Sequence, residues 1–168
     1  MTPDPADARS TGRRARVAVA GARGFVATHL VPRLVAEGYD VDALLRDPRG
    51  FHPRDHVAIH VVDVADAEEV ADALVGCTVA YYLVHAMAGG PGFEDRDRAM
   101  ATAFAEGAAR ADVGRIVYLG GLGHEGLSTH LSSRQEVGSL LGATGVPVVE
   151  LRAAVVLGAG SISFEMVR

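Results

Sequence analysis

The sequence of 168 residues contains no lysine, no tryptophan and a single cysteine, Cys77. All 16 basic residues are arginines, so no lysine is available as a phosphate-loop ligand, a Schiff base or a general base. A lone cysteine excludes an internal disulfide bond and a cysteine-based zinc site. It is compatible with a reducing compartment, and we expect a cytoplasmic protein.

The chain also lacks an excess of positive charge and any long apolar run. With 21 acidic residues the net charge is −5, which does not favour a nucleic-acid partner. No apolar segment approaches the roughly 20 residues of a membrane-spanning helix, so we expect no membrane partner. Residues 1–15 are polar, and the apolar segment of a signal peptide does not follow them. We predict a flexible tail there and one domain over residues 16–168.

Short apolar runs alternate with helical patterns along this domain. Six runs of strand length lie at residues 17–20, 41–45, 57–62, 78–84, 115–119 and 147–151. Helical patterns lie at about residues 24–37, 66–76, 93–111 and 133–145, and the connection after Leu45 has the pattern of a loop. Asp66-x-x-Glu69 opens the second helical pattern, and the last begins at a capping box of Ser133 and Glu136. This alternation predicts an α/β fold, namely a doubly wound, mostly parallel sheet of the Rossmann type in three α/β/α layers.

The first run ends in a glycine turn, Gly21-Ala-Arg-Gly-Phe-Val-Ala27, with the spacing G-x-x-G-x-x-A. Gly21 allows a tight turn, Gly24 lets the backbone approach a pyrophosphate, and Ala27 is small enough for close packing of helix and strand. The N-terminus of the following helix favours phosphate. The residues assigned to a dinucleotide site are therefore Gly21, Arg23, Gly24, Phe25 and Val26. The alternative is a glycine-rich turn without a ligand.

The same segment resembles the extended and atypical short-chain dehydrogenase/reductases, whose turn reads T-G-x-x-G-x-x-G. Within that superfamily the chain is most similar to the NAD(P)H-binding NmrA-like and sugar-epimerase-like proteins. Further matching segments lie at residues 43–48, 62–66, 81–85, 115–122, 133–138 and 150–154. Ala20 and Ala27 depart from the threonine and the last glycine of the pattern. The resemblance implies a dinucleotide-binding domain, and it implies that the C-terminal substrate-binding part of extended members is largely absent here.

The end of the second strand bears on the choice of dinucleotide. Arg46 follows that strand and can pair with the 2′-phosphate of NADP(H), and Arg23 can add a second contact. Asp40 and Asp42 fall too early in the strand to contact the ribose of NAD(H), although Asp47 lies near its tip. We therefore favour NADP(H) over NAD(H). Two solvated surface arginines are the alternative.

Two further strand ends supply residues for the same site. The resemblance places Asp63 and Val64, after the third strand, at the adenine edge, whereas a loop or cap acid is the alternative for Asp63. Leu83, Val84 and His85 leave the fourth strand toward the crevice where such sheets bind ligands. His85 is expected to contact the ribose or a substrate, unless it is an ordinary loop histidine.

The catalytic residues of ordinary short-chain enzymes are missing. Those enzymes use a serine after the fifth strand and a Tyr-x-x-x-Lys pair on the next helix. Here the fifth strand ends Leu119-Gly-Gly121, and the pair aligns with His130 and Arg134, which become the candidate catalytic residues. Two functions stay open. One is an NADP(H)-dependent oxidoreductase or epimerase-like enzyme with an unidentified small-molecule substrate, and the other is a non-catalytic redox sensor or assembly factor.

Three histidines, His52, His56 and His60, recur at every fourth position. On a helix they would form a metal-binding stripe. Because Pro53 and the strand pattern from Val57 interrupt such a helix, we expect no metal site there.

Overall fold

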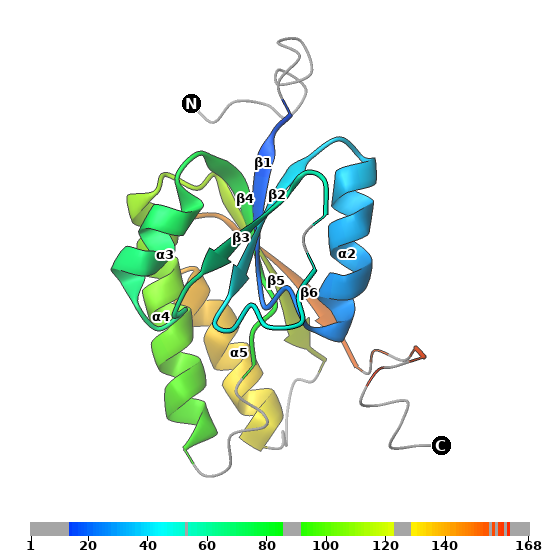
Figure 1. Cartoon of the computed structure of the whole chain (residues 1–168). Helices are drawn as coiled ribbons and strands as arrows, with labels where there is room; N and C mark the ends of the chain where they lie inside the picture. Colours follow the sequence, from blue (N-terminus) through cyan, green and yellow to red (C-terminus); the bar gives the residue numbers. More distant parts are fainter. Residues whose placement is uncertain are drawn as a thin grey trace.

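The computed structural model describes residues 14–52, 54–85, 92–122, 129–154, 156, 158–159 and 161, with the side chains of residues 129–131 left out. Within this part, six parallel strands form one sheet in the order β3-β2-β1-β4-β5-β6 (Figure 1). The strands are β1 (Arg16–Ala20), β2 (Asp40–Leu45), β3 (Val57–Val61), β4 (Cys77–Tyr82), β5 (Arg115–Gly121) and β6 (Val148–Ala153). The helices are α2 (Phe25–Ala36), α3 (Ala67–Leu74), α4 (Phe93–Arg110) and α5 (Thr129–Leu141). The predicted doubly wound fold is confirmed.

The helices lie on both faces of the sheet, which gives the predicted three layers. α3, α4 and α5 cover one face and α2 covers the other (Figure 1). On the first face the rings of Tyr82 and Phe104 pack with centroids 5.0 Å apart. α3 and α4 approach closely at Gly107, where a Cβ atom would lie 2.5 Å from Val70 Cγ1. The strands β1 and β2 are buried on both sides, as the successive apolar residues 17–20 and 43–45 predict, although β2 also buries Asp42.

The second face is covered only in part by the described residues. α2 packs Ala27, Val31 and Leu34 against β1 and β2. On the edge strand β6, Val149 and Leu151 are 40% and 54% exposed. Apolar side chains are thus open to solvent beside β6 in the described part of the chain.

Local capping explains where the helices begin. At α3, Asp66 Oδ1 accepts hydrogen bonds from the N–H groups of Glu68 (2.9 Å) and Glu69 (3.1 Å), as the sequence predicts. α5 begins a full turn before Ser133, so the predicted capping box at Ser133 is wrong. Ser133 is instead buried within the helix, where its hydroxyl donates to Asp97 Oδ2 at 3.3 Å.

The ordered fold extends to the residues just before β1. The N–H of Asp40 donates to the carbonyl of Ala15 at 3.0 Å, and Arg14 Nη2 donates to the carbonyl of Val35 at 3.2 Å. The rest of the predicted tail lies outside the described residues. Among the described residues, no helix combines the length and apolar composition needed to span a bilayer.

Candidate functional site

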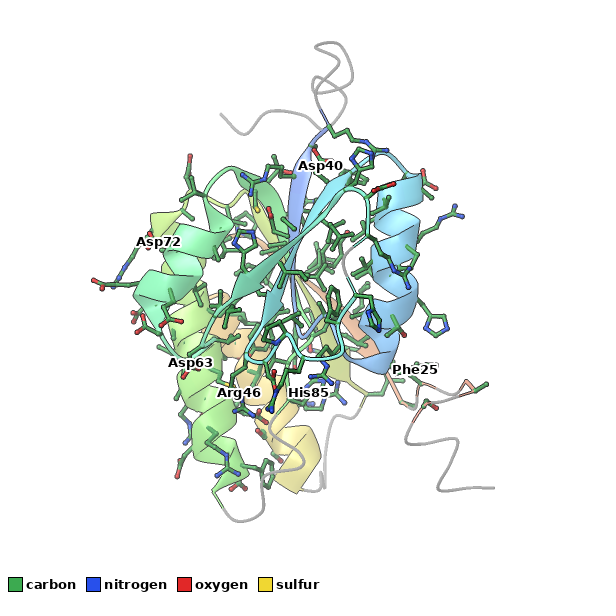
Figure 2. The ribbon with its side chains drawn as sticks, viewed as in Figure 1. Phe25, Asp40, Arg46, Asp63, Asp72 and His85 are labelled. Carbon is green, nitrogen blue, oxygen red and sulfur yellow. The ribbon has the colours of Figure 1, made fainter. Side chains whose placement is uncertain are left out.

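A cavity of about 520 Å³ opens at the carboxyl ends of the central strands. This is the edge of a parallel sheet where such folds bind ligands. Figure 2 shows Arg46, Asp63 and His85 at this end of the molecule and Asp40 at the opposite end. The lining residues are Gly21, Arg23, Gly24, Leu44, Leu45, Arg46, Asp47, Asp63, Val64, Leu83, Val84, His85, Arg96 and Met100.

The glycine turn forms the cavity wall between β1 and α2. Gly21 has φ +80°, and a Cβ atom there would lie 2.7 Å from the carbonyl oxygen of Leu83. The N–H of Leu83 donates to the carbonyl of Ala20 at 3.0 Å, which holds the end of β4 against the turn. The turn closes with a hydrogen bond of 2.9 Å from the Gly24 N–H to the Gly21 carbonyl. Glycine is therefore required at position 21 both by its backbone conformation and by this close approach.

The first turn of α2 presents uncapped N–H groups. Gly24 is the N-cap residue and offers no side chain, and the first turn contains no acidic residue. The N–H groups of Phe25, Val26 and Ala27 precede the first intrahelical bond, from the Thr28 N–H to the Gly24 carbonyl. Such a helix start binds an anion through its backbone. The side chains of Phe25 and Val26 do not line the cavity, so any contribution from these two predicted residues comes from their backbone.

At the tip of β2, two arginines line the cavity beside a carboxylate that is paired with a third arginine. Asp47 accepts from Arg49 Nη2 at 2.6 Å and from Arg49 Nε at 2.9 Å. This hydrogen bonding to Arg49 lowers the pKa of Asp47 below its ordinary value, with smaller contributions from the charges of Arg23 and Arg46. Arg23 Nη1 donates to the Asp47 carbonyl at 3.3 Å. Arg46 makes no hydrogen bond or ion pair to any described residue.

After β3, Asp63 and Val64 line the cavity as the sequence analysis anticipated. Asp63 Oδ1 accepts from the Ala65 N–H at 3.0 Å, and the Asp63 N–H donates to Glu69 Oε2 at 2.8 Å. One carboxylate oxygen therefore stabilises the loop before α3, which is the structural alternative weighed for this residue. The same side chain still contributes to the wall of the cavity.

After β4, His85 lines the cavity and contacts Arg134 from α5. Arg134 Nη2 lies 3.0 Å from His85 Nε2 and 2.9 Å from the carbonyl oxygen of Leu119 on β5. Burial lowers the pKa of His85 to about 4, the charge of Arg134 lowers it further, and Asp97 acts in the opposite direction. The imidazole is therefore neutral at physiological pH. The side chain of His130, the other catalytic candidate, lies outside the described residues.

At the end of β5, the side chain of Glu150 lies against Gly120. A Cβ atom on Gly120 would collide with Oε1 of Glu150 on β6. This Oε1 is buried without a hydrogen-bond partner among the described residues, whereas Oε2 accepts from Arg152 at 2.9 Å. Glu150 therefore occupies the space beside Gly120, where the sequence pattern of ordinary short-chain enzymes places a serine.

Sequence reasoning missed four residues of the cavity wall, namely Leu44, Leu45, Arg96 and Met100, and noted Asp47 only as an acid near the tip of the second strand. The two leucines are ordinary residues of β2. Arg96 and Met100 come from the first half of α4, and only the packing of α4 beside α3 brings them to this edge. Their sequence pattern is that of a common amphipathic helix, which carries no sign of a ligand.

Charged residues at the amino ends of the strands bind one another. Asp42 is 3% exposed. Its Oδ2 accepts from Arg16 Nη2 at 2.7 Å and from the thiol of Cys77 at 3.2 Å, and its Oδ1 lies 2.8 Å from His60 Nε2. His56 Nδ1 pairs in the same way with Asp40 Oδ1 at 2.9 Å.

The described residues contain no group of three side chains arranged to hold a metal ion. His56 and His60 pair with separate aspartates on β2. The spacing of the histidines therefore reflects strand pairing in this part of the chain.

A parallel sheet with a glycine turn and an uncapped helix start at its carboxyl edge defines a dinucleotide-binding protein of the Rossmann class. A family model described as NAD(P)H-binding matches residues 21–145. The chain belongs to this NAD(P)H-binding family.

Curated proteins with a similar sequence include reductases. A bifunctional dihydroflavonol 4-reductase/flavanone 4-reductase of Pyrus communis is 34% identical over 91 residues, which cover 48% of this chain and 25% of the relative. The chain therefore spans about a quarter of that curated relative's length.

Two solved structures share the fold. The enzyme WbmG of Bordetella bronchiseptica in complex with NAD superposes with a TM-score of 0.73 at 19% identity, covering 88% of this chain and 55% of that chain. NmrA, a negative transcriptional regulator in complex with NADP, superposes with a TM-score of 0.69 at 17% identity, covering 83% of this chain and 45% of that chain.

Proposed function

We propose that this domain binds NADP(H) in preference to NAD(H) at the carboxyl edge of the sheet. The observation that carries the proposal is the arrangement at the tip of β2, where Arg46 lines the cavity without an ionic partner among the described residues. NAD(H) and NADP(H) differ at the adenosine ribose, which carries a 2′-hydroxyl in the first and a 2′-phosphate in the second. A free guanidinium recognises the phosphate through charge-assisted hydrogen bonds.

The one carboxylate at this tip is poorly placed to favour NAD(H). An NAD site offers a free carboxylate to the ribose hydroxyl. Both oxygens of Asp47 already accept hydrogen bonds from Arg49. Arg23 adds a second positive side chain to the same wall. The net charge near the adenosine ribose therefore suits a phosphate better than a hydroxyl.

The residues of the cavity fit a dinucleotide along its length. The glycine turn and the first N–H groups of α2 suit the pyrophosphate, because the helix start has no side-chain cap and no acidic residue in its first turn. Asp63, Val64 and Met100 would lie around the adenine, and Leu83 to His85 would face the nicotinamide half. The bound nicotinamide would supply hydride transfer.

The affinity of Arg46→Ala for the two cofactors tests the preference. We expect NADPH to bind about 10- to 30-fold less tightly, which corresponds to about 1.4–2 kcal/mol for a lost charge-assisted contact. NADH should bind unchanged. Calorimetric titration of both cofactors measures this difference. The matched control is Arg33→Ala, which removes an exposed arginine of α2 that pairs with Glu37 away from the cavity. Equal losses for NADPH and NADH would contradict the assignment.

We further propose that the chain is the cofactor domain of an oxidoreductase or epimerase-like enzyme, as the curated relative that is a reductase suggests. A non-catalytic redox sensor is the second candidate. It is favoured by the absence of the tyrosine and lysine and by Glu150, which fills the serine position beside Gly120. Consumption of NADPH with a panel of carbonyl compounds supports the enzyme. Tight binding with no turnover on any compound supports the sensor.

A further inference from the structure

The contact between Arg134 and His85 fixes which nitrogen of the histidine carries its proton. Arg134 Nη2 lies 3.0 Å from His85 Nε2. A guanidinium only donates hydrogen bonds, so Nε2 must accept and cannot carry hydrogen. The proton of the neutral imidazole is therefore on Nδ1. This nitrogen is a hydrogen-bond donor, and it has no partner among the described residues.

Arg134 is itself held in place by β5. The same Nη2 donates to the carbonyl of Leu119 at 2.9 Å, and the hydroxyl of Tyr118 donates to the carbonyl of Arg134 at 2.9 Å. Its Nε is buried without a partner among the described residues. The guanidinium and the imidazole thus each keep a donor without a partner among the described residues. The buried Nε of Arg134 is costly to leave unpaired unless a further group accepts from it.

The charged groups around His85 come from two helices. Burial is the largest cause of the lowered pKa of His85, Arg134 on α5 lowers it further, and Asp97 on α4 acts in the opposite direction. Arg96 on α4 and Arg23 in the glycine turn line the same cavity and add positive charge. His85 therefore stays neutral, and the donor on Nδ1 persists through the physiological pH range.

The position of His85 indicates which part of a ligand this donor meets. In the strand order, the glycine turn after β1 separates the tip of β2 from the end of β4. Arg46 and Asp63 line the cavity on the β2 and β3 side, and His85 lines it on the β4 side. A dinucleotide with its pyrophosphate on the glycine turn would carry its adenosine half toward Arg46, and its other half toward His85.

We propose that Arg134 is a positioning residue that holds His85 in the Nδ1–H form, and that His85 donates from Nδ1 to an oxygen of the nicotinamide half of the cofactor. The oxygen is a ribose hydroxyl or the carboxamide oxygen, both of which are uncharged acceptors. This inference rests on the proposed dinucleotide binding. It assigns His85 and Arg134 to the nicotinamide end of the cavity, in a chain that lacks the tyrosine and lysine pair of ordinary short-chain enzymes.

The tautomer can be read directly by NMR. In protein labelled with ¹⁵N, we expect His85 to show a protonated Nδ1 and an unprotonated Nε2 at pH 7, with its signals assigned by their loss in His85→Phe. In Arg134→Met, the titration midpoint of His85 should move upward from about 4, because the neighbouring positive charge and its hydrogen bond are removed. A protonated Nε2 in the wild type, or an unchanged midpoint in the variant, would overturn the positioning role.

Binding of a whole and a truncated ligand tests the contact to the nicotinamide half. Adenosine 2′,5′-bisphosphate carries the adenosine end of NADPH without the nicotinamide. His85→Phe should weaken NADPH about fivefold, as expected for one lost hydrogen bond, and leave the bisphosphate unchanged. The unchanged fragment also shows that the variant is folded. His56→Asn, at the opposite end of the sheet, is the matched control, since asparagine tolerates the positive φ of that position.

The outcomes separate this inference from the proposed function. If the wild-type chain binds neither NADPH nor NADH, the proposed function fails and this inference fails with it. If the wild type binds NADPH but His85→Phe binds it equally well, only the role of His85 fails. An equal loss of NADPH and of the bisphosphate in His85→Phe also overturns that role, because it indicates a general distortion of the cavity.

To distinguish the two acceptors, the same variants are titrated with thionicotinamide adenine dinucleotide phosphate, in which sulfur replaces the carboxamide oxygen. A fivefold effect of His85→Phe that disappears with this analogue assigns the carboxamide oxygen. An effect that persists assigns the ribose hydroxyl. Both results support the contact to the nicotinamide half.

Discussion

The two ends of β2 both carry charged side chains, but those at the amino end are paired with protein groups and Arg46 at the carboxyl end is not paired with any described residue. At the amino end, Asp42 is buried and both of its oxygens contact Arg16, His60 or Cys77. At the carboxyl end of the same strand, Arg46 faces a cavity with no partner among the described residues. The loss of one partner from a buried pair destabilises a fold, whereas an unpaired charge beside a cavity is available to a ligand. The residue type alone does not show whether a charged side chain is paired within the fold or available to a ligand.

The largest effect expected from this comparison comes from the glycine turn. In Gly21→Ala, the new Cβ would lie 2.7 Å from the Leu83 carbonyl oxygen and must displace the end of β4. We expect NADPH and NADH both to bind on the order of 100-fold less tightly, or about 3 kcal/mol, as measured by calorimetry.

Gly38→Ala is the matched control for this substitution. Gly38 also has a positive φ, +92°, but a Cβ atom there meets nothing within 4 Å. The variant should therefore lose about 1–2 kcal/mol of stability through backbone strain and bind both cofactors normally. Equal binding losses in the two variants would indicate that strain, and not the close approach to β4, explains the effect.

Acid should destabilise the carboxyl end through His85. The folded-state pKa of His85 is about 4, below its ordinary 6.5. Between these values the unfolded chain takes up a proton that the folded chain does not, so the free energy of unfolding falls as the pH falls from 6.5 toward 4. The loss is about 3 kcal/mol at most. Urea unfolding of wild type and His85→Phe at several pH values measures it, and the variant should show a flatter profile in that window. Parallel profiles would contradict the neutral state of His85.

A smaller effect on stability, with none on binding, is expected at the amino end. Asp42→Asn removes the charge that Arg16 and His60 contact. Because Arg16 and His60 are each about a third exposed, water compensates in part, and we expect a loss of about 2 kcal/mol in urea unfolding. NADPH affinity should not change. Asp47→Asn makes the same chemical change at the other end of β2, where the carboxylate is exposed, and should leave stability as it is.

The sequence predicted the elements well where the signal was local. The six strands, the four helices and the loop after Leu45 follow from runs of apolar residues and from turn residues within each segment. The cap of α3 at Asp66 was predicted correctly, since a cap depends on neighbours in the chain. The start of α5 was not, because Ser133 has the sequence of a cap but is buried against Asp97 of another helix.

The sequence by itself determined the parallel α/β sheet and its glycine turn, because backbone conformation and short-range packing depend on residues close together in the chain. Only the tertiary structure decided how the polar groups are used. His85 and Arg134 are 49 positions apart, Asp42 and Cys77 are 35 apart, and Glu150 reaches Gly120 from the neighbouring strand. No local pattern links such residues, since their contacts arise only when strand order and helix packing bring distant segments together.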